Sequence, residues 1–417
     1  MMKQKKSMTA YWKETLLGVF AVAVFCFWQF FYPFIPLMRE TAQLFLLTYE
    51  YFLERIVLPG GLAQYVSEFI VQFFFYPTFA ALFYALLFVL LHWLTSKLLK
   101  KYLPVLKEII RYALSYIPSF LMIWVAMIPY IPLTPTIAVL MVMTVMLLIP
   151  ESGKPRLVST CLSIIVLYWL AGPVAVLLLF CYLRWIPLTA TLFACCVVVS
   201  SLFVPYPLRK IACGIDYNWR APDKELGTFE EMECDMLMRS QQWQDIIDKY
   251  TNPKSPAVRS AVLLAYYQSK QIGQKEFYSR MIIPIEMMQY EPSVFNISGN
   301  FLKTRFGTLT SANMLSDMAF VMNLPMVTMR TSFETMEFIP NYNKSSRSIR
   351  RLIQTNMITG NYDVALKYIR ILENTICYRK WARNIRALVE HPEHISNDYF
   401  YNNSQKSYAN TEDMFFI

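Results

Sequence analysis

The sequence predicts an all-α protein in two parts: a polytopic bundle of about seven transmembrane helices, then a water-exposed domain of helical hairpins. Composition is the first observation, since the 417-residue chain is 56% hydrophobic and only 16% charged, outside the range of average soluble domains. Clustering is the second, because the apolar residues gather before Pro205 and most charged residues follow Leu208. The third is a pair of similar turns in the second half, at Asn323 and Gly360.

Seven apolar stretches are long enough, or nearly so, to cross a bilayer, which takes roughly 20 residues per helix. They are residues 16–37, 69–94, 113–131, 134–148, 157–171, 173–183 and 187–204. The fifth and sixth form one apolar run interrupted by Ala171-Gly172-Pro173, which we interpret as a tight hairpin of two short helices. The alternative is one long kinked helix, which gives six spans. The first stretch resembles a signal peptide, but no small-residue cleavage site follows it, so we expect an uncleaved span.

Basic residues in the first half indicate the orientation, because they gather in loops on one side when the spans alternate. With a cytoplasmic N-terminus, the inner side holds Lys3, Lys5, Lys6, Lys13, Lys97, Lys100, Lys101, Lys107, Arg111, Lys154, Arg156 and Arg184. The first outer loop holds only Arg39 and Arg55. Seven spans then place the second half in the periplasm, whereas six leave it in the cytosol beside Arg209 and Lys210. The formal charge of +10 is thus explained without a nucleic-acid partner.

We expect a transmembrane domain at 1–206 with interfacial helices at 39–68, a linker at 207–227, a helical-repeat domain at 228–390 and a polar tail at 391–417. Residues 228–250 predict two helices with a break at Gln241-Gln242-Trp243. The helix after Gly360 resembles the second helix of a tetratricopeptide repeat, and the turn at Asn323 has the same phase 37 residues earlier. Such repeats commonly hold a peptide or helix of a partner protein. The alternative is that these helices only cap the membrane part.

The basic residues Arg347, Arg350 and Arg351 stand at a helix start in the repeat domain. We regard them as candidate partner-binding residues, with a solvated surface as the plainer alternative.

The first outer loop is the most unusual stretch of the chain. Two apolar helices, at 44–57 and 62–72, are expected there, joined by Pro59-Gly60-Gly61, and each carries one polar stripe typical of a helix lying in the membrane interface. The stripes consist of Gln43, Glu50 and Glu54, and of Gln64, Glu68 and Gln72. Polar groups at membrane depth are often functional, so we select Glu50, Glu54, Glu68 and Gln72 as substrate-binding candidates.

An acidic residue directly after the first span, followed by two interfacial helices and a second span, resembles the opening of GT-C glycosyltransferases. The resemblance implies that Glu40 is a catalytic base or metal ligand, acting beside a divalent metal and a sugar on a polyprenyl phosphate. The second acidic residue of that pattern is absent, because residues 131–134 carry no charge. The alternative is that Glu40 ends the first span and pairs with Arg39 or Arg55.

Other chemical signatures are missing. The chain contains no GxGxxG, GxxxxGK[ST], HExxH or GxSxG motif, so nucleotide-binding and hydrolase functions lack support. We expect no bound metal and, outside the GT-C alternative, no cofactor. A transporter is less favoured because the spans lack ionisable residues at their centres.

End to end, the chain resembles a family of polytopic membrane proteins from Bacteroides-type bacteria that has no assigned activity. The resemblance rests on residues 58–77, Gln241-Gln242-Trp243, residues 339–342 and 378–381, and Gly360-Asn361-Tyr362. It implies architecture only. Two hypotheses follow: an inner-membrane protein whose repeats hold a protein partner in cell-envelope assembly, or a membrane glycosyltransferase that uses Glu40.

Overall fold

The computed structural model describes residues 11–217, 226–280, 308–337, 339 and 344–410. Helices account for all regular structure in these ranges, as the sequence predicts, and none of the described residues forms a strand. The chain divides into two compact units. Unit 1 consists of residues 1–39 and 48–220, and unit 2 consists of residues 40–47 and 221–417. A short piece of the segment between the first two predicted spans therefore belongs to unit 2.

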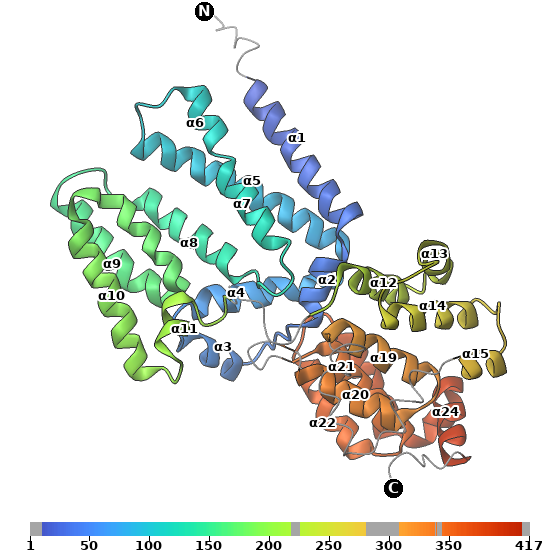
Figure 1. Ribbon diagram of the computed structural model, residues 1–417. Helices are drawn as coiled ribbons and strands as arrows, with labels where there is room; N and C mark the ends of the chain where they lie inside the picture. Colours follow the sequence, from blue (N-terminus) through green and yellow to red (C-terminus); the bar gives the residue numbers. More distant parts are fainter. Residues whose placement is uncertain (1–10, 218–225, 281–307, 338, 340–343, 411–417) are drawn as a thin grey trace, which may run out of the picture. The chain divides into compact units, whose positions relative to one another are not determined.

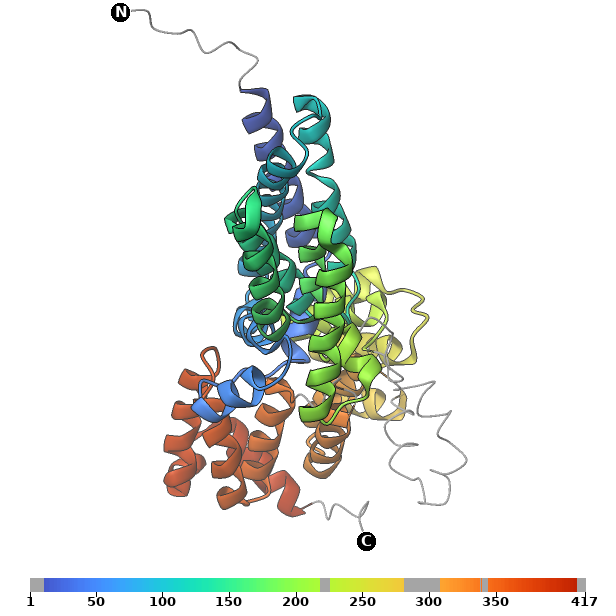
Figure 2. The same ribbon diagram turned by 90° about the vertical axis from the view of Figure 1, so that its left-hand side faces the viewer.

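Unit 1 contains five helices that are long and apolar enough to cross a membrane: Trp12–Phe31, Pro77–Tyr102, Glu108–Ala126, Gly153–Cys181 and Leu183–Phe203. A shorter apolar helix lies at Thr134–Leu148. In order, these are α1 (Trp12–Cys26) with η2 (Phe27–Phe31), α5 (Pro77–Tyr102), α6 (Glu108–Leu114) with α7 (Ile117–Ala126), α8 (Thr134–Leu148), α9 (Gly153–Ala171), η4 (Gly172–Trp185) and α10 (Ile186–Phe203). The long helices run side by side in both views (Figures 1 and 2). Unit 1 thus has the composition and shape of a membrane-embedded bundle.

One end of unit 1, here called the amino-terminal end, is defined by polar contacts between helix termini. The ammonium of Lys13 pairs with Glu108, and the Tyr112 hydroxyl donates to the Lys13 carbonyl oxygen at 2.7 Å. At the last residues of α8, the Lys101 ammonium donates to the carbonyl oxygen of Leu147 at 2.8 Å. The start of α1, the end of α5, the start of α6 and the end of α8 therefore share this end.

The opposite end, called the glycine end, is defined in the same way. The Arg39 guanidinium donates to the carbonyl oxygens of Ala126, at 2.7 Å, and Ile131, at 3.2 Å, just after α7. The Thr134 hydroxyl, at the first residue of α8, donates to Asp216 at 2.8 Å. The end of α7, the start of α8 and the segment after α10 therefore meet here.

The chain reverses at Gly172, as expected for a hairpin, although α9 and η4 follow each other without a gap. The Arg156 guanidinium, near the start of α9, donates to the carbonyl oxygen of Cys181 at 2.7 Å. A straight helix would place residues 25 positions apart about 37 Å from each other. Gly172 makes the reversal with φ 77° and ψ −155°, a region that only glycine visits readily. Helices α9 and η4 are therefore antiparallel neighbours.

A second glycine turn packs directly on this reversal. Gly60 has φ 86°, and a Cβ atom on it would lie 3.4 Å from the Cα atom of Gly172. Its N–H donates to the Trp169 carbonyl oxygen at 2.8 Å, while the Trp169 indole donates to the Ile56 carbonyl oxygen at 3.0 Å. The hydroxyl of Tyr217 also donates to the carbonyl oxygen of Ala171. The glycine end is thus held by close backbone contacts.

Several predicted span boundaries are wrong, including those of the third stretch, which covers Glu108–Ala126 instead of 113–131. The first helical stretch ends at Phe31 instead of residue 37, because a break at Tyr32-Pro33 precedes α2 (Phe34–Thr41). The second begins at Pro77 instead of residue 69. Tyr76 is extended, as is usual before proline, and Pro77 starts α5 at the position where a missing N–H is harmless. Residues 69–75 instead end α4 (Gly61–Val71) and form η3 (Gln72–Phe75).

The helix predicted at 44–57 is also shorter than expected. Residues 43–47 are not helical, and α3 (Tyr49–Ile56) begins after Thr48, whose hydroxyl accepts a hydrogen bond from the Tyr51 N–H at 3.2 Å. This side-chain cap starts the helix there, so Gln43 does not share a face with Glu50 and Glu54. After α10, unit 1 ends with α11 (Leu208–Cys213).

Unit 2 is built from paired helices (Figure 1). The pairs are α12 (Phe229–Arg239) with α13 (Trp243–Lys249), α14 (Pro256–Gln268) with α15 (Gln274–Arg280), α19 (Leu309–Val321) with α20 (Pro325–Glu337), and α21 (Ser346–Ile358) with α22 (Tyr362–Glu373). The first helices contact one another in succession, α12 with α14, α14 with α19, and α19 with α21. The break predicted at Gln241-Gln242-Trp243 is the turn of the first pair.

All four pairs use the same turn. In each, one residue has a left-handed backbone: Gln241 at φ 56°, Lys270 at φ 59°, Asn323 at φ 57° and Gly360 at φ 78°. The next residue donates its N–H to the carbonyl oxygen five positions earlier, at 2.8 to 3.0 Å, which is the Schellman motif. The same local turn geometry therefore recurs in the four pairs that the structure describes.

The last helices of unit 2 are α23 (Arg379–Glu390), η6 (Pro392–Asn397) and α24 (Tyr399–Asn410). The sequence suggests a loosely ordered tail from Pro392, but the described part is folded, with Ile395 and Tyr401 buried. The Gln405 amide donates to the Met357 carbonyl oxygen at 2.8 Å and so ties α24 to α21. The polar composition misleads because a few apolar residues suffice to bury one face of a short helix.

Candidate functional site

The strongest polar cluster around a predicted site residue lies inside unit 2, where residues 40–47 are packed. This segment, called the strap, begins with the last two residues of α2 and continues without helix through residues 43–47. Ala42, Leu44 and Phe45 are buried. The Leu47 N–H donates to the carbonyl oxygen of Asn374 at 2.7 Å, in the turn after α22.

Glu40 is the buried polar centre of the strap and is only 2% exposed. Its Oε1 accepts hydrogen bonds from the Ser346 hydroxyl at 3.0 Å and from the Tyr378 hydroxyl at 2.7 Å. Its Oε2 lies 3.7 Å from Nη2 of Arg239, while Nη1 of that arginine donates to the Thr41 hydroxyl at 3.0 Å. Two hydroxyl donors and one cation therefore surround this carboxylate.

Local structure explains why these partners meet. Ser346 stands in the first turn of α21, Tyr378 occupies the position just before α23, and Arg239 is the last residue of α12. Unpaired N–H groups at a helix start favour a nearby negative charge, so a carboxylate beside the start of α21 is well placed. None of the three partners is near Glu40 in sequence, the closest being about 200 positions away.

The cluster stabilises neutral hydroxyl and thiol groups. Burial, and next the Glu40 carboxylate, raise the pKa of Tyr378 well above its usual range, despite the opposing charge of Arg239. The same two causes raise the pKa of Cys377 to about 11. Neither side chain is therefore an ionised nucleophile at neutral pH. The arrangement binds one carboxylate oxygen through two hydroxyl donors; catalysis by Glu40 stays a prediction.

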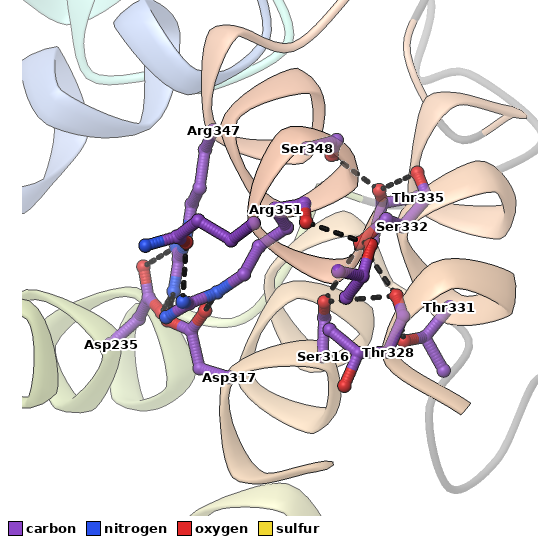
Figure 3. Close-up of polar contacts among 12 residues, drawn as sticks. Asp235, Ser316, Asp317, Thr328, Thr331, Ser332, Thr335, Arg347, Ser348 and Arg351 are labelled. Atoms are coloured by element: carbon purple, nitrogen blue, oxygen red, sulfur yellow. Dashed lines mark hydrogen bonds and ion pairs between the residues drawn. The ribbon is translucent and has the colours of Figure 1, made fainter. Parts of the chain in front are cut away.

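A second polar network lies between α12, α19 and α21 (Figure 3). The Arg347 guanidinium donates two bonds of 2.7 Å to Asp235 and one of 2.5 Å to Asp317. Arg351 donates to the other oxygen of Asp317 at 2.8 Å. Burial alone raises the pKa of Asp317, but Arg347 and Arg351 outweigh it and hold this pKa well below its usual range.

The predicted partner-binding arginines thus have internal roles. Arg347 is buried, and Arg351 and Arg347 share Asp317. Arg350 lies over the Trp381 ring, 4.8 Å from its centroid, and burial followed by the charge of Arg351 lowers its pKa. Any partner that uses these guanidinium groups has to compete with contacts inside unit 2.

Beside this network, hydroxyl side chains line the contact between α19, α20 and α21 (Figure 3). The Ser316 and Ser332 hydroxyls lie 3.0 Å apart, and those of Thr335 and Ser348 lie 2.6 Å apart. These side chains are small and their polar atoms are satisfied, so the helices can pack closely without a fully apolar core.

The four predicted substrate-binding residues lie in unit 1 and do not converge. Glu68 is buried. Its Oε2 accepts hydrogen bonds from the Tyr51 hydroxyl at 2.6 Å and from the Arg55 guanidinium at 2.9 Å. Its Oε1 accepts a hydrogen bond from the Gln64 amide at 2.9 Å. The amide of Gln72 bonds the carbonyl oxygen of Phe69 at 2.8 Å.

Glu50 and Glu54, in contrast, are exposed on α3. The sequence also suggested Arg39 or Arg55 as partners of Glu40, but Arg39 bonds carbonyl oxygens of unit 1 and Arg55 bonds Glu68. The actual partners of Glu40 were missed. The only available signal was Tyr378, at the start of the Tyr-Arg-Lys-Trp segment.

Within the described ranges, no three His, Cys, Asp or Glu side chains are grouped as metal ligands. All eight cysteines lie in those ranges.

Comparison with known proteins gives a family but no activity. No curated protein matches the chain. No solved structure matches it either. A family model described as a family of unknown function, DUF6057, matches residues 8–417, almost the whole chain. The protein described here, with its apolar helices and its paired-helix unit, therefore belongs to the DUF6057 family.

Proposed function

We propose that this protein is a seven-pass integral membrane protein whose unit 2 is a tetratricopeptide-like scaffold on the side opposite the N-terminus. The scaffold holds a protein partner during assembly of the cell envelope. The membrane is the bacterial inner membrane, with the N-terminus in the cytosol and unit 2 in the periplasm. The sequence resemblance to proteins of Bacteroides-type bacteria is the basis for the bacterial assignment.

Segment lengths support seven passes. Helix α9, with 19 residues, spans about 28 Å, and the 14 residues of η4 span a similar length because a 3₁₀ helix rises roughly 2.0 Å per residue. Both values approach the hydrocarbon thickness of about 30 Å. Helix α8, with 15 residues, reaches about 22 Å. The antiparallel course of α9 and η4 favours two passes over one.

The contacts at the two ends of unit 1 support the sidedness. The start of α1 and the basic residue Lys101 belong to the amino-terminal end, and Arg156 lies over the ring of Tyr102 at the same end of α5. Arg39, Gly60 and Tyr217 belong to the glycine end, and the chain continues into unit 2 after Arg39 and again after residue 220. Basic residues mark the cytoplasmic side, so unit 2 is assigned to the periplasm.

The recurring turn is the observation that carries the scaffold function. Four helix pairs in the described ranges share one Schellman geometry, and α12 contacts α14, α14 contacts α19, and α19 contacts α21. Such series of hairpins offer extended surfaces whose common use is binding a segment of another protein. Sugar transfer by Glu40, with a divalent metal and a polyprenyl-phosphate sugar, gains no support from a carboxylate that is buried among residues of its own unit.

Site-specific photo-crosslinking in cells tests the scaffold. A crosslinking amino acid is placed at Phe333 or Val364, which are 45% and 38% exposed on α20 and α22. The control position is Val105, 96% exposed in the loop between α5 and α6. We expect a discrete protein adduct from unit 2 positions and none from Val105. Correctly inserted protein that yields no discrete adduct from any exposed position of unit 2 would overturn the scaffold function.

A further inference from the structure

The strap is held by unit 2 in the manner of a bound peptide. Its residues contact the end of α12 through Arg239, the start of α21 through Ser346, and the turn between α22 and α23 through Asn374 and Tyr378. These elements are drawn from between Arg239 and Tyr378 and come together only in the folded unit. The strap therefore marks a surface that receives a segment of chain made of a last helical turn and a non-helical stretch.

The side chains that the surface accepts follow a simple pattern. An acidic residue, Glu40, is bound by two hydroxyls and faces an arginine. Four and five positions later, Leu44 and Phe45 are 4% and 2% exposed. A backbone hydrogen bond from Leu47 to Asn374 completes the contact. Charge and apolar burial thus select one pattern of an acidic residue and two apolar residues.

The fit of the strap is incomplete. Oε2 of Glu40 and Oε1 of Gln43 are buried without a hydrogen-bond donor, and the nearest guanidinium nitrogen stands 3.7 Å from Glu40. A buried acceptor without a partner costs about 1 to 3 kcal/mol relative to the satisfied group. Unsatisfied buried groups are uncommon in folded proteins, and two lie within four residues of this short segment. The surface can therefore bind a better-matched segment more tightly than it binds the strap.

We propose that the strap is an internal ligand of unit 2, occupying a binding site for a partner peptide of the same chemistry. The partner segment carries an acidic residue at the end of a helical turn, followed, four and five positions later, by two large apolar residues in a non-helical stretch. This inference rests on the proposed scaffold function and names the class of partner. The partner displaces residues 40–47 when it binds, and the covalent connection to unit 1 returns the strap when the partner leaves.

The tethered strap competes strongly with an external peptide, because the effective concentration of the strap at its binding site is of the order of millimolar. If the intrinsic dissociation constant of the strap is about tenfold below that concentration, only about one molecule in ten has an open site. Apparent affinity for an external peptide is reduced by the same factor. Weakening the strap therefore increases peptide binding.

A fluorescent peptide with the sequence of residues 38–48 provides the probe, and fluorescence anisotropy on the full-length protein in detergent measures its binding. The variant combines Glu40→Ala with Phe45→Ala, which removes the carboxylate and the most deeply buried apolar side chain of the strap. Glu334→Ala is the matched control, because Glu334 is partly exposed on α20 and pairs with Arg330. We expect the double variant to bind the peptide about tenfold more tightly than wild type. The control should bind like wild type, and a peptide that carries both substitutions should not bind the variant.

Two results would overturn the proposal. The first is a double variant that keeps its helical circular dichroism and protease resistance yet binds the peptide no better than wild type. If the variant loses its fold, thermal unfolding is repeated with the peptide present; failure of the peptide to raise the Tm identifies the strap as a structural part and not a ligand. Absence of crosslinked partners together with successful peptide binding would refute the envelope scaffold but not the internal ligand.

Discussion

Replacing Arg347 by methionine should destabilise unit 2 more than any other single change in its ionic network. Arg347 joins Asp235 on α12 to Asp317 on α19 and is 8% exposed. Without it, Asp317 retains Arg351, whereas Asp235 is left as a buried carboxylate without its cation. Breaking a buried ion pair from one side costs about 3 to 5 kcal/mol. Unit 2 has roughly 200 residues, so its Tm should fall by about 6 to 20 °C.

Protease resistance as a function of temperature measures this change in the full-length protein, with a C-terminal tag that reports on unit 2. Arg330→Met is the control, because its pair with Glu334 is exposed and should contribute about 1 kcal/mol or less. Adding Asp235→Leu to Arg347→Met removes the uncompensated carboxylate, so most of the lost stability should return. A fall no larger than that of the control, or a double variant weaker than Arg347→Met, would refute the role assigned to this network.

Three further outcomes follow from particular positions. The pKa of Asp317 is depressed in the folded state, so the Asp317 carboxylate stabilises the fold at a pH above its unfolded-state pKa of about 4. This stabilisation is lost as the pH falls below that pKa. The variant Asp317→Asn should abolish this part of the acid dependence of the Tm. Lys270 has a left-handed backbone, which costs a non-glycine residue about 1 to 2 kcal/mol. Lys270→Gly should remove this cost and raise the Tm of unit 2 by about 2 to 4 °C for each kcal/mol of stability gained. An unchanged Tm would contradict the turn geometry. Gly60→Ala should lower the thermal stability of unit 1, because φ is 86° and the new Cβ meets Gly172, whereas Gly18→Ala, with open space around it, should not.

Local patterns in the sequence were sufficient for the coarse fold. Apolar runs identified the helices of unit 1, and Gly172-Pro173 identified the reversal after α9 because both residues act through their own backbone. Gln241-Gln242-Trp243 identified a turn for the same reason. The start of α3 was missed, since the cap at Thr48 competes with an apolar run that looks helical by hydrophobicity alone.

The candidate site was less accessible to sequence reasoning, because its contacts are long-range. Glu40 and Tyr378 are separated by 338 positions, and Arg347 and Asp235 by 112. In the sequence, Arg347 is indistinguishable from a member of a solvated basic patch, because both of its aspartate partners are distant in the chain. A single sequence gives the residue types that favour ion pairs but no information on which of them meet.

The sidedness of the two chain ends tests the central proposal most directly. Alkaline phosphatase, active only after export, and a green fluorescent protein, fluorescent only in the cytosol, are each fused after Ile417, with matching fusions before Met1. Seven passes put the two ends on opposite sides of the membrane. We expect phosphatase activity at the C-terminus and fluorescence at the N-terminus. Fluorescence at both ends would contradict the seven-pass topology and the periplasmic scaffold together.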